Sequence, residues 1–450
     1  MVFLTTFAIY NLNGREIGAS DTQSTKYAAI ELATRGTLTL DAVVARDPEL
    51  GARLNVIKAR GWHVRSVSPV APSVMAAGVA RLLAGARLVD LTAPLAVTVV
   101  AKLTASLLTA AAVAMAFVVA ARRTPRAEAL LLAAGLGLGT NLWAQASQTL
   151  WQTETVVFAT VLAVACLAVP QARLSAARVW IASACLGLAG AARPQMAPAI
   201  AVVAMSMVVR RPGWTTVFGL LPLAVIAGML AELQTRWFGT PLGPMPYLES
   251  LHTTMHGVSG SFGNPLRGAA GLLLSPSRGL LVFSPVVMIT VGGVRQFWRE
   301  GWRGDLFWWG TAALVQLALY SSYSVWWGGH TYGPRYLMDV LPLLVPIAAT
   351  ALATRPASRW WSGAAAAALA WSIAVAGLGA FVYPAERWNN RPANVDHAHE
   401  RLWDWRDPQI IRCWKSPWHP GNFVLFDTAA WRAASRMDSG SALGGAGLRE

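Results

Sequence analysis

Charged side chains are scarce in this chain of 450 residues, since Asp, Glu, Lys and Arg together make up only 13% of it. A soluble domain usually carries about 25% charged residues, and 55% of this chain is hydrophobic. The charges come in clusters, as between Arg295 and Asp305, and long apolar stretches separate the clusters. Runs of roughly 20 apolar residues are typical of membrane spans. The composition therefore excludes an ordinary soluble domain and predicts an integral membrane protein.

Cysteine is also rare, and Cys166, Cys185 and Cys413 make no disulfide framework. The chain lacks a glycine-rich phosphate loop after a strand, which excludes the common nucleotide-binding motif. It also lacks the internal repeat of inverted-topology transporters. Basic residues outnumber acidic ones by 37 to 22, which gives a net charge of +15. We expect no nucleic-acid partner, because most basic clusters lie in short loops beside apolar segments.

The apolar segments predict an all-α polytopic membrane protein. The stretch Met1–Tyr10 lacks the basic start of a signal peptide; it covers only about 15 Å as a helix, and we interpret it as part of a first membrane helix. With it there are about eleven predicted spans. The other ten are 94–121, 127–144, 155–171, 178–193, 196–209, 214–231, 279–294, 305–322, 337–353 and 360–382.

Basic residues fall in every second connection between these spans, and the positive-inside rule places such connections in the cytoplasm. The N-terminus is then cytoplasmic, and the first long loop, 11–93, faces outward. We expect a transmembrane domain over 1–382 and a small exterior tail over 383–450. The outward connections hold most of the Asp, Glu, His and Trp, so chemistry is expected on the outer face. The basic residues are Arg122, Arg123, Arg126, Arg173, Arg178, Arg210, Arg211, Arg295, Arg299, Arg303, Arg355 and Arg359.

The first outer loop contains a segment that favours a short helix along the membrane surface. Ser20 or Asp21 suits the N-cap position, the pattern from Tyr27 to Leu32 suits an amphipathic helix, and Gly36 is expected to stop it. On residue chemistry alone, the simpler role for Asp21 is to cap this helix.

Three outward segments together resemble the GT-C superfamily of membrane glycosyltransferases. In the first, Asp21 precedes Lys26-Tyr27 and a helix ended by glycine, which is most similar to the branch with protein O-mannosyltransferases and lipid A aminoarabinose transferases. The resemblance implies that Asp21 is the catalytic base and that Lys26 and Tyr27 match an Arg-Tyr pair. That family often has Asp-Glu where this chain has Asp21-Thr22, and Glu16 is a candidate for the missing acid. The second and third segments are 271–285 and 326–336.

Arg278 and Arg335 each stand at the outer edge of a predicted span. A guanidinium there can bind a phosphate in forked geometry, although an arginine that only snorkels to the interface has the same position. Weaker candidates for substrate contacts are Glu154, Arg193 and His330. A pair of histidines four residues apart could ligate a metal if helical, the tail tryptophans could stack on sugars, and a lysine inside the second span could line a cavity. These residues are His252, His256, Trp403, Trp405, Trp414, Trp418 and Lys102.

The resemblance implies an inverting glycosyltransferase of the bacterial inner membrane, with its tail in the periplasm. A polyprenyl-phosphate sugar would be the donor, membrane lipids would surround it, and the acceptor could be a glycan, a lipid or a protein. Asp21 would take the proton of the acceptor hydroxyl. The sequence leaves open whether a divalent metal assists. Two alternatives remain: a transporter or flippase for a lipid-linked saccharide, and a non-catalytic partner in cell-envelope assembly.

Overall fold

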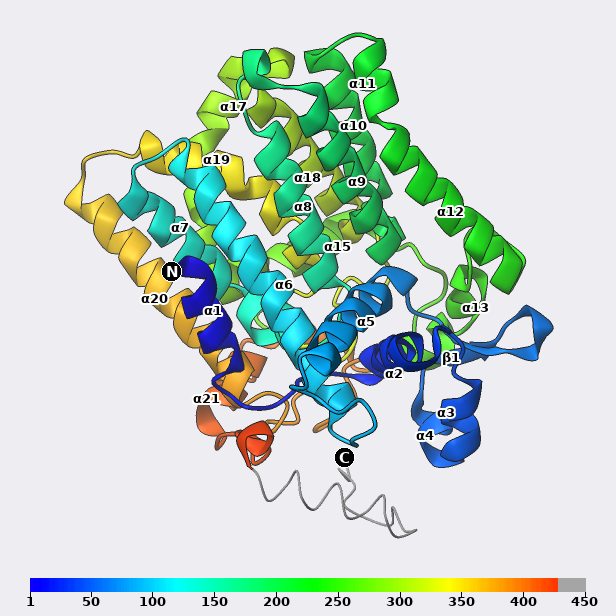
Figure 1. Ribbon diagram of the computed structural model, residues 1–450. Helices are drawn as coiled ribbons and strands as arrows, with labels where there is room; N and C mark the ends of the chain where they lie inside the picture. Colours follow the sequence, from blue (N-terminus) through cyan, green and yellow to red (C-terminus); the bar gives the residue numbers. More distant parts are fainter. Residues whose placement is uncertain (428–450) are drawn as a thin grey trace.

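The computed structural model describes residues 1–427, which are mostly helical (Figure 1). The only sheet in this range is the antiparallel hairpin of β1 (Val56–Lys58) and β2 (Val64–Ser66). The α-helices are α1 (Val2–Asn11), α2 (Ser20–Arg35), α3 (Asp41–Arg46), α4 (Pro48–Arg53), α5 (Val70–Gly85), α6 (Ala96–Ala121), α7 (Arg126–Leu138), α8 (Thr153–Leu167), α9 (Ala176–Ala192), α10 (Ala197–Arg210), α11 (Trp214–Gly219), α12 (Leu221–Phe238), α13 (Met245–Ser250), α14 (His252–His256), α15 (Pro265–Leu274), α16 (Leu280–Phe283), α17 (Val294–Glu300), α18 (Asp305–Ser321), α19 (Leu341–Ala353), α20 (Arg359–Phe381) and α21 (Gln409–Lys415).

The predicted all-α class is confirmed, and each predicted apolar segment is mainly helical. In the segment 127–144 the α-helix α7 ends at Leu138, and the π-helical turn Leu142–Ala146 follows. Three further segments are broken where one continuous helix was expected. The segment 214–231 divides at Leu220 into α11 and α12, and 279–294 divides at Ser284 into α16, the 3₁₀ stretch Pro285–Gly293 and the start of α17. The segment 337–353 contains a 3₁₀ turn before α19. A proline follows each of these three breaks closely, at Pro222, Pro285 and Pro342. Proline cannot donate the backbone hydrogen bond of an interior helical residue, so a continuous helix is interrupted near it.

Two helices of the described residues, α6 and α20, are long and apolar enough to cross a membrane by length and composition. The other strongly apolar helices are 10 to 17 residues long, among them α1, α8 and α19. A helix rises about 1.5 Å per residue, so each of these is shorter than the roughly 30 Å hydrocarbon layer. By their own length these shorter helices do not reach across such a layer.

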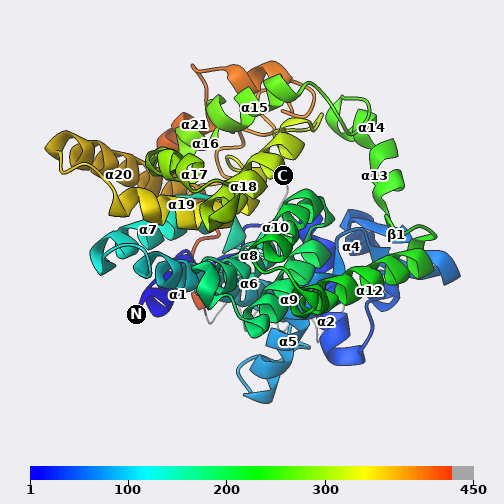
Figure 2. The ribbon, with the colours of Figure 1, turned by 90° about the horizontal axis from the view of Figure 1, so that it is seen from above.

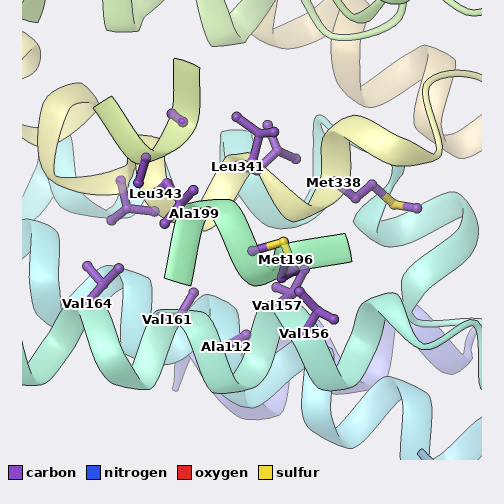
Figure 3. Close-up of a cluster of buried hydrophobic side chains, with 14 of the residues drawn as sticks. Ala112, Val156, Val157, Val161, Val164, Met196, Ala199, Met338, Leu341 and Leu343 are labelled. Carbon is purple, nitrogen blue, oxygen red and sulfur yellow. The ribbon is translucent and has the colours of Figure 1, made fainter. Parts of the chain in front are cut away.

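The main hydrophobic core lies where α6, α8, α10 and α19 meet (Figure 3). Val157, Val161, Met196 and Leu343 are each at most 1% exposed. Ala112 faces them from α6 and adds no bulk, so the helix backbones can approach closely. This packing fixes the relative positions of the helix ends that carry the polar residues.

The basic connections gather at one end of the bundle, where α11 and α17 lie (Figure 1). Arg122 and Arg178 donate to the carbonyls of Ala165 and Cys166 at the end of α8. Arg210 donates to the carbonyl of Leu167, the last residue of that helix, and to that of Val169 just beyond it. Across the same end, Arg123 pairs with Asp305 and Arg355 pairs with Glu128. The alternation read from the sequence thus corresponds to two physically separate ends of the molecule.

The opposite end carries α2, α3, α4, the hairpin and α21 (Figure 1). The predicted helix of the first loop is present as α2, longer than expected, and Gly36 ends it with φ +70°. The predicted N-cap was wrong: Ala19 is the cap residue, and Asp21 lies in the first turn. The prediction also missed α5, which packs against α2. Its apolar residues were interpreted as part of a polar loop.

Candidate functional site

Asp21 and Arg335 are 314 residues apart in sequence and form an ion pair at the polar end of the bundle. Arg335 Nη1 donates to Asp21 Oδ2 at 3.0 Å, and Asn55 Nδ2 donates to Asp21 Oδ1 at 3.2 Å. The Asp21 side chain is 41% exposed, so substrate can reach it, whereas that of Arg335 is 16% exposed. The structure thus brings together the acid and one of the two arginines singled out from the sequence.

Aromatic rings hold Arg335 in place. Its guanidinium carbon lies 5.2 Å from the Trp151 ring centroid and 5.8 Å from that of Tyr336. Trp151 is itself fixed by the hydrogen bond from its indole N–H to the carbonyl of Ile17. The Nε atom of Arg335 is buried and has no hydrogen-bond partner among the described residues. The printed ion pair with Asp21 uses only Nη1, and a guanidinium has five N–H donors, so Arg335 can also donate to a further acceptor.

Glu16 lies in the same loop as Asp21 but has a structural partner. Lys26 Nζ lies 2.9 Å from the Glu16 carboxylate, and Thr149 donates to it as well. Both charged side chains are at most 10% exposed. Tyr27, on the next position of α2, packs in a small cluster with Leu40 and other apolar side chains of α3 and the segment around it. Lys26 and Tyr27 therefore hold in place the loop that carries Asp21. The sequence alone did not distinguish this structural role from contact with a substrate.

The structure argues against the predicted phosphate-binding role of Arg278, which is fully buried. All five of its N–H donors have partners within the protein, which leaves no donor for a ligand. The acceptors are the carbonyl oxygens of Ser277, Trp327 and Gly329 and the side-chain oxygens of Asn389 and Gln409. Arg278 is a structural centre that ties the 383–427 segment to the helices.

Arg193 is also committed within the protein. Its Nη1 lies 2.6 Å from Asp339 Oδ2, and Tyr320 donates to the same oxygen at 2.5 Å. Asp339 was missed from the sequence, although it is the one charged residue in an otherwise apolar predicted span, which is a recognised sign of a paired or functional group. Glu154 is fully buried, and its Oε2 has no hydrogen-bond partner among the described residues.

His330 belongs to a histidine–carboxylate cluster rather than to the Asp21 pair. Its Nε2 lies 2.9 Å from Asn394 Oδ1 and 3.4 Å from Asp396 Oδ2, and His256 Nδ1 lies 3.1 Å from Asp396 Oδ1. Burial raises the pKa of Asp396, but hydrogen bonds from His256 and Trp327 outweigh it and leave the pKa below its usual value. Within residues 1–427 no group of three or more His, Cys, Asp or Glu side chains could hold a metal ion. The predicted His252–His256 metal pair therefore has no further ligand there.

Two other cations are buried as structural anchors. Lys102 was predicted to line a cavity, but its ammonium donates to the carbonyl of Tyr10 and the side chains of Asn13 and Gln148. Arg15 donates to Asn422 and to the carbonyls of Ala380 and Tyr383. Both anchors hold the start of the first loop, and Arg15 joins that loop to the C-terminal segment.

The comparisons with known proteins found no similar protein. No family model matches the chain. No curated protein and no solved structure matches it significantly either. The function has to be argued from the site's own chemistry.

Glu386 is a buried acid in the 383–427 segment. It is 8% exposed, Gln409 donates to its Oε1 at 3.3 Å, and its Oε2 has no hydrogen-bond partner among the described residues. Burial raises the pKa of Glu386 to about 7. No pattern in the sequence singles out this residue.

We expect Glu386→Gln to stabilise the protein at pH 8 and to have no such effect at pH 4. The carboxyl holds its proton to a higher pH in the folded state, so folding loses free energy as pH rises from about 4.5 to about 7. The loss is on the order of 3 kcal/mol. Melting temperature measured against pH tests this, with exposed Glu400→Gln as the control. Equal melting curves of parent and Glu386→Gln across this range would contradict the prediction.

Proposed function

We propose that this chain is a multi-pass membrane glycosyltransferase of the GT-C type, with about eleven transmembrane helices and an outward-facing site. It moves a sugar from polyprenyl phosphate to an acceptor hydroxyl with inversion. The observation that carries the proposal is the contact of 3.0 Å between Asp21 and Arg335. A carboxylate that can take a proton lies beside a cation that can take a phosphate.

The two side chains have separate tasks in this reaction. Asp21 accepts the proton of the acceptor hydroxyl while that oxygen attacks the anomeric carbon of the donor. The bond from this carbon to the phosphate oxygen breaks, and polyprenyl phosphate leaves with the electron pair. Arg335 stabilises the negative charge that grows on the phosphate. Asp21 then releases its proton to water, which its partly exposed side chain can reach.

The separation of the two ends of the bundle supports an outward-facing site. Asp21, Arg335 and the 383–427 segment lie at the end opposite the basic connections (Figure 1). Under the positive-inside rule the basic end is cytoplasmic, so the pair faces the periplasm of a bacterial inner membrane. A lipid-linked donor already present in the outer leaflet then needs no nucleotide.

Purified protein in lipid nanodiscs, given a polyprenyl-phosphate donor with a radioactive sugar and a panel of acceptors, tests the proposal. We expect label to leave the lipid and appear on one acceptor. Arg335→Gln should reduce kcat about 10²- to 10³-fold, because the variant cannot offset the leaving-group charge. Exposed Arg406→Gln, in the C-terminal segment, is the matched control and should transfer at the parent rate.

The same donor in sealed vesicles distinguishes the transporter alternative. Movement of the intact labelled lipid between leaflets, with no loss of sugar, would reject transfer and favour a flippase. A non-catalytic assembly partner would give neither movement nor transfer. The Asp21 carboxylate favours transfer over transport, since moving a lipid-linked sugar requires no general base.

A further inference from the structure

A pocket of about 370 Å³ lies next to the histidine–carboxylate cluster. Its walls come from the loop 257–264 and the first turn of α15, from the segment after α18 and from the C-terminal segment. The volume falls within the range of about 300–1,000 Å³ that is typical of small-molecule sites. The lining residues most relevant to a ligand are Phe262, Arg267, Tyr323, Trp326, Trp327 and His399.

The loop on one side of the pocket is held by specific hydrogen bonds. The carbonyl of Gly260 accepts from Ser324 Oγ at 2.7 Å and lies 3.0 Å from His252 Nδ1. Phe262 forms a β-bridge with Tyr323. Helices α13 and α14 carry the chain from α12 towards this loop along the periphery of the molecule (Figure 2). The pocket therefore has a defined wall built on short elements.

Aromatic side chains give the pocket flat apolar surfaces. Trp326 and Trp327 are almost buried, and the rings of Phe262 and Tyr323 lie 6.1 Å apart. An aromatic ring offers a flat face to the CH groups on one side of a sugar, while the sugar hydroxyls keep their own hydrogen bonds. These surfaces suit a sugar ring better than a purely apolar ligand, because Asn264 and Ser324 are also in the lining.

His399 is oriented by contacts with two backbone carbonyls and with the ring of Trp327. Its Nε2 lies 3.0 Å from the carbonyl oxygen of His256 and 2.8 Å from that of Asp396, and its ring lies 4.4 Å from that of Trp327. Since a carbonyl only accepts, Nε2 carries the proton, and in the neutral ring Nδ1 is an acceptor. The ring can then accept a hydrogen bond from a ligand hydroxyl.

The charge of the lining favours an anionic ligand. Arg267 is exposed, and the pocket's lining, all of it within the described chain, includes no Asp or Glu. An arginine without a competing carboxylate in the same pocket binds a carboxylate or phosphate by charge-assisted hydrogen bonds.

The pocket and the Asp21–Arg335 pair share one stretch of chain. Trp327 lines the pocket, and a Cβ placed on the adjacent Gly328 would lie 3.6 Å from the Cβ of Arg335. On the other side, the ring of Tyr323 packs at 5.8 Å against that of Tyr336, which contacts Arg335. A ligand in the pocket is therefore separated from the pair by only a thin layer of side chains.

We propose that this pocket binds a sugar ring carrying an anionic substituent, as the acceptor end of the reaction. The assignment as acceptor rests on the proposed function, whereas binding itself does not require transfer. Arg267 selects the anionic group, the aromatic surfaces hold the ring, and His399 accepts from a hydroxyl. The donor phosphate belongs at Arg335. The sugar in the pocket is a part of the acceptor other than the hydroxyl that reacts at Asp21, because a layer of side chains separates the pocket from the pair.

Isothermal titration of the purified full chain with glucuronic acid, glucose and inorganic phosphate, without any donor, tests the proposal. We expect glucuronic acid to bind about tenfold more tightly than glucose, which corresponds to about 1.4 kcal/mol, and phosphate to bind more weakly than glucuronic acid. Arg267→Gln should abolish the preference for glucuronic acid and retain glucose binding. Phe262→Ala should weaken both sugars, and Arg406→Gln should change neither.

Unchanged glucuronic acid binding in both Arg267→Gln and Phe262→Ala would overturn the proposal. Phosphate binding as tight as that of glucuronic acid would also overturn it, because the site would then not recognise the sugar. Transfer by the parent without saturable sugar binding rejects the pocket and leaves the proposed function standing. Saturable binding sensitive to both variants, without transfer to any acceptor, retains the pocket and rejects the proposed function.

Discussion

Asp21→Asn is expected to lower the rate of sugar transfer by about 10²- to 10⁴-fold, the usual range for loss of a general base. The amide has almost the same shape as the carboxylate, and its oxygen can still accept from Asn55. It cannot take a proton from the acceptor hydroxyl. Folding should be little affected, because an ion pair as exposed as that with Arg335 contributes about 0–1 kcal/mol.

Transfer by purified Asp21→Asn, with its melting temperature measured on the same preparation, checks this expectation. The matched control is Asp90→Asn, an exposed acid of the same outer loop that only accepts from Thr92. The control should transfer at the parent rate. If Asp21→Asn folds normally and transfers as fast as the parent, Asp21 is not the base.

Arg278→Met is expected to destabilise the fold by on the order of 3 kcal/mol or more. The substitution leaves five acceptors, among them Asn389 and Gln409, without their donors in a buried site, and each unsatisfied buried group costs about 1–3 kcal/mol. The variant should also lose the contact of the guanidinium with the Trp388 ring. Expression level and thermal unfolding in detergent or nanodiscs measure the effect.

Arg335→Met is the matched comparison for this prediction. Both arginines stand next to the start of an apolar segment, but Arg335 has a single ion-pair partner and an unpaired Nε. Arg335→Met should therefore unfold near the parent temperature while losing transfer. A parent-like melting curve for Arg278→Met would show that its hydrogen bonds do not hold the C-terminal segment in place.

The helices were predictable because strongly apolar helices leave long apolar runs in the sequence. The breaks at Leu220 and Ser284 were not, because averaging over a run hides the local effect of a proline such as Pro222 or Pro285. The two ends of the molecule were predictable from the alternation of basic connections. Locating the basic residues in every second connection requires no knowledge of tertiary contacts. The helix α5 was missed because its apolar residues lie within a predominantly polar loop.

The site was only partly predictable, because its decisive contacts join residues far apart in sequence. Arg278 and Arg335 have similar surroundings in the sequence, yet Gln409 reaches one from 131 residues away and Asp21 reaches the other from 314. No local pattern carries that difference. Asp396 was missed for the same reason, since its partners His256 and His330 come from other segments.

The hydrogen bonds of Arg278 and Arg15 with the C-terminal segment have a consequence for biosynthesis. Asn389, Gln409 and Asn422 are translated after all the helices from α1 to α20. Until they emerge from the ribosome, both buried guanidinium groups lack several of their acceptors. The polar end of the bundle is thus completed last, and a chain interrupted before this segment would keep these guanidinium groups without several of their acceptors.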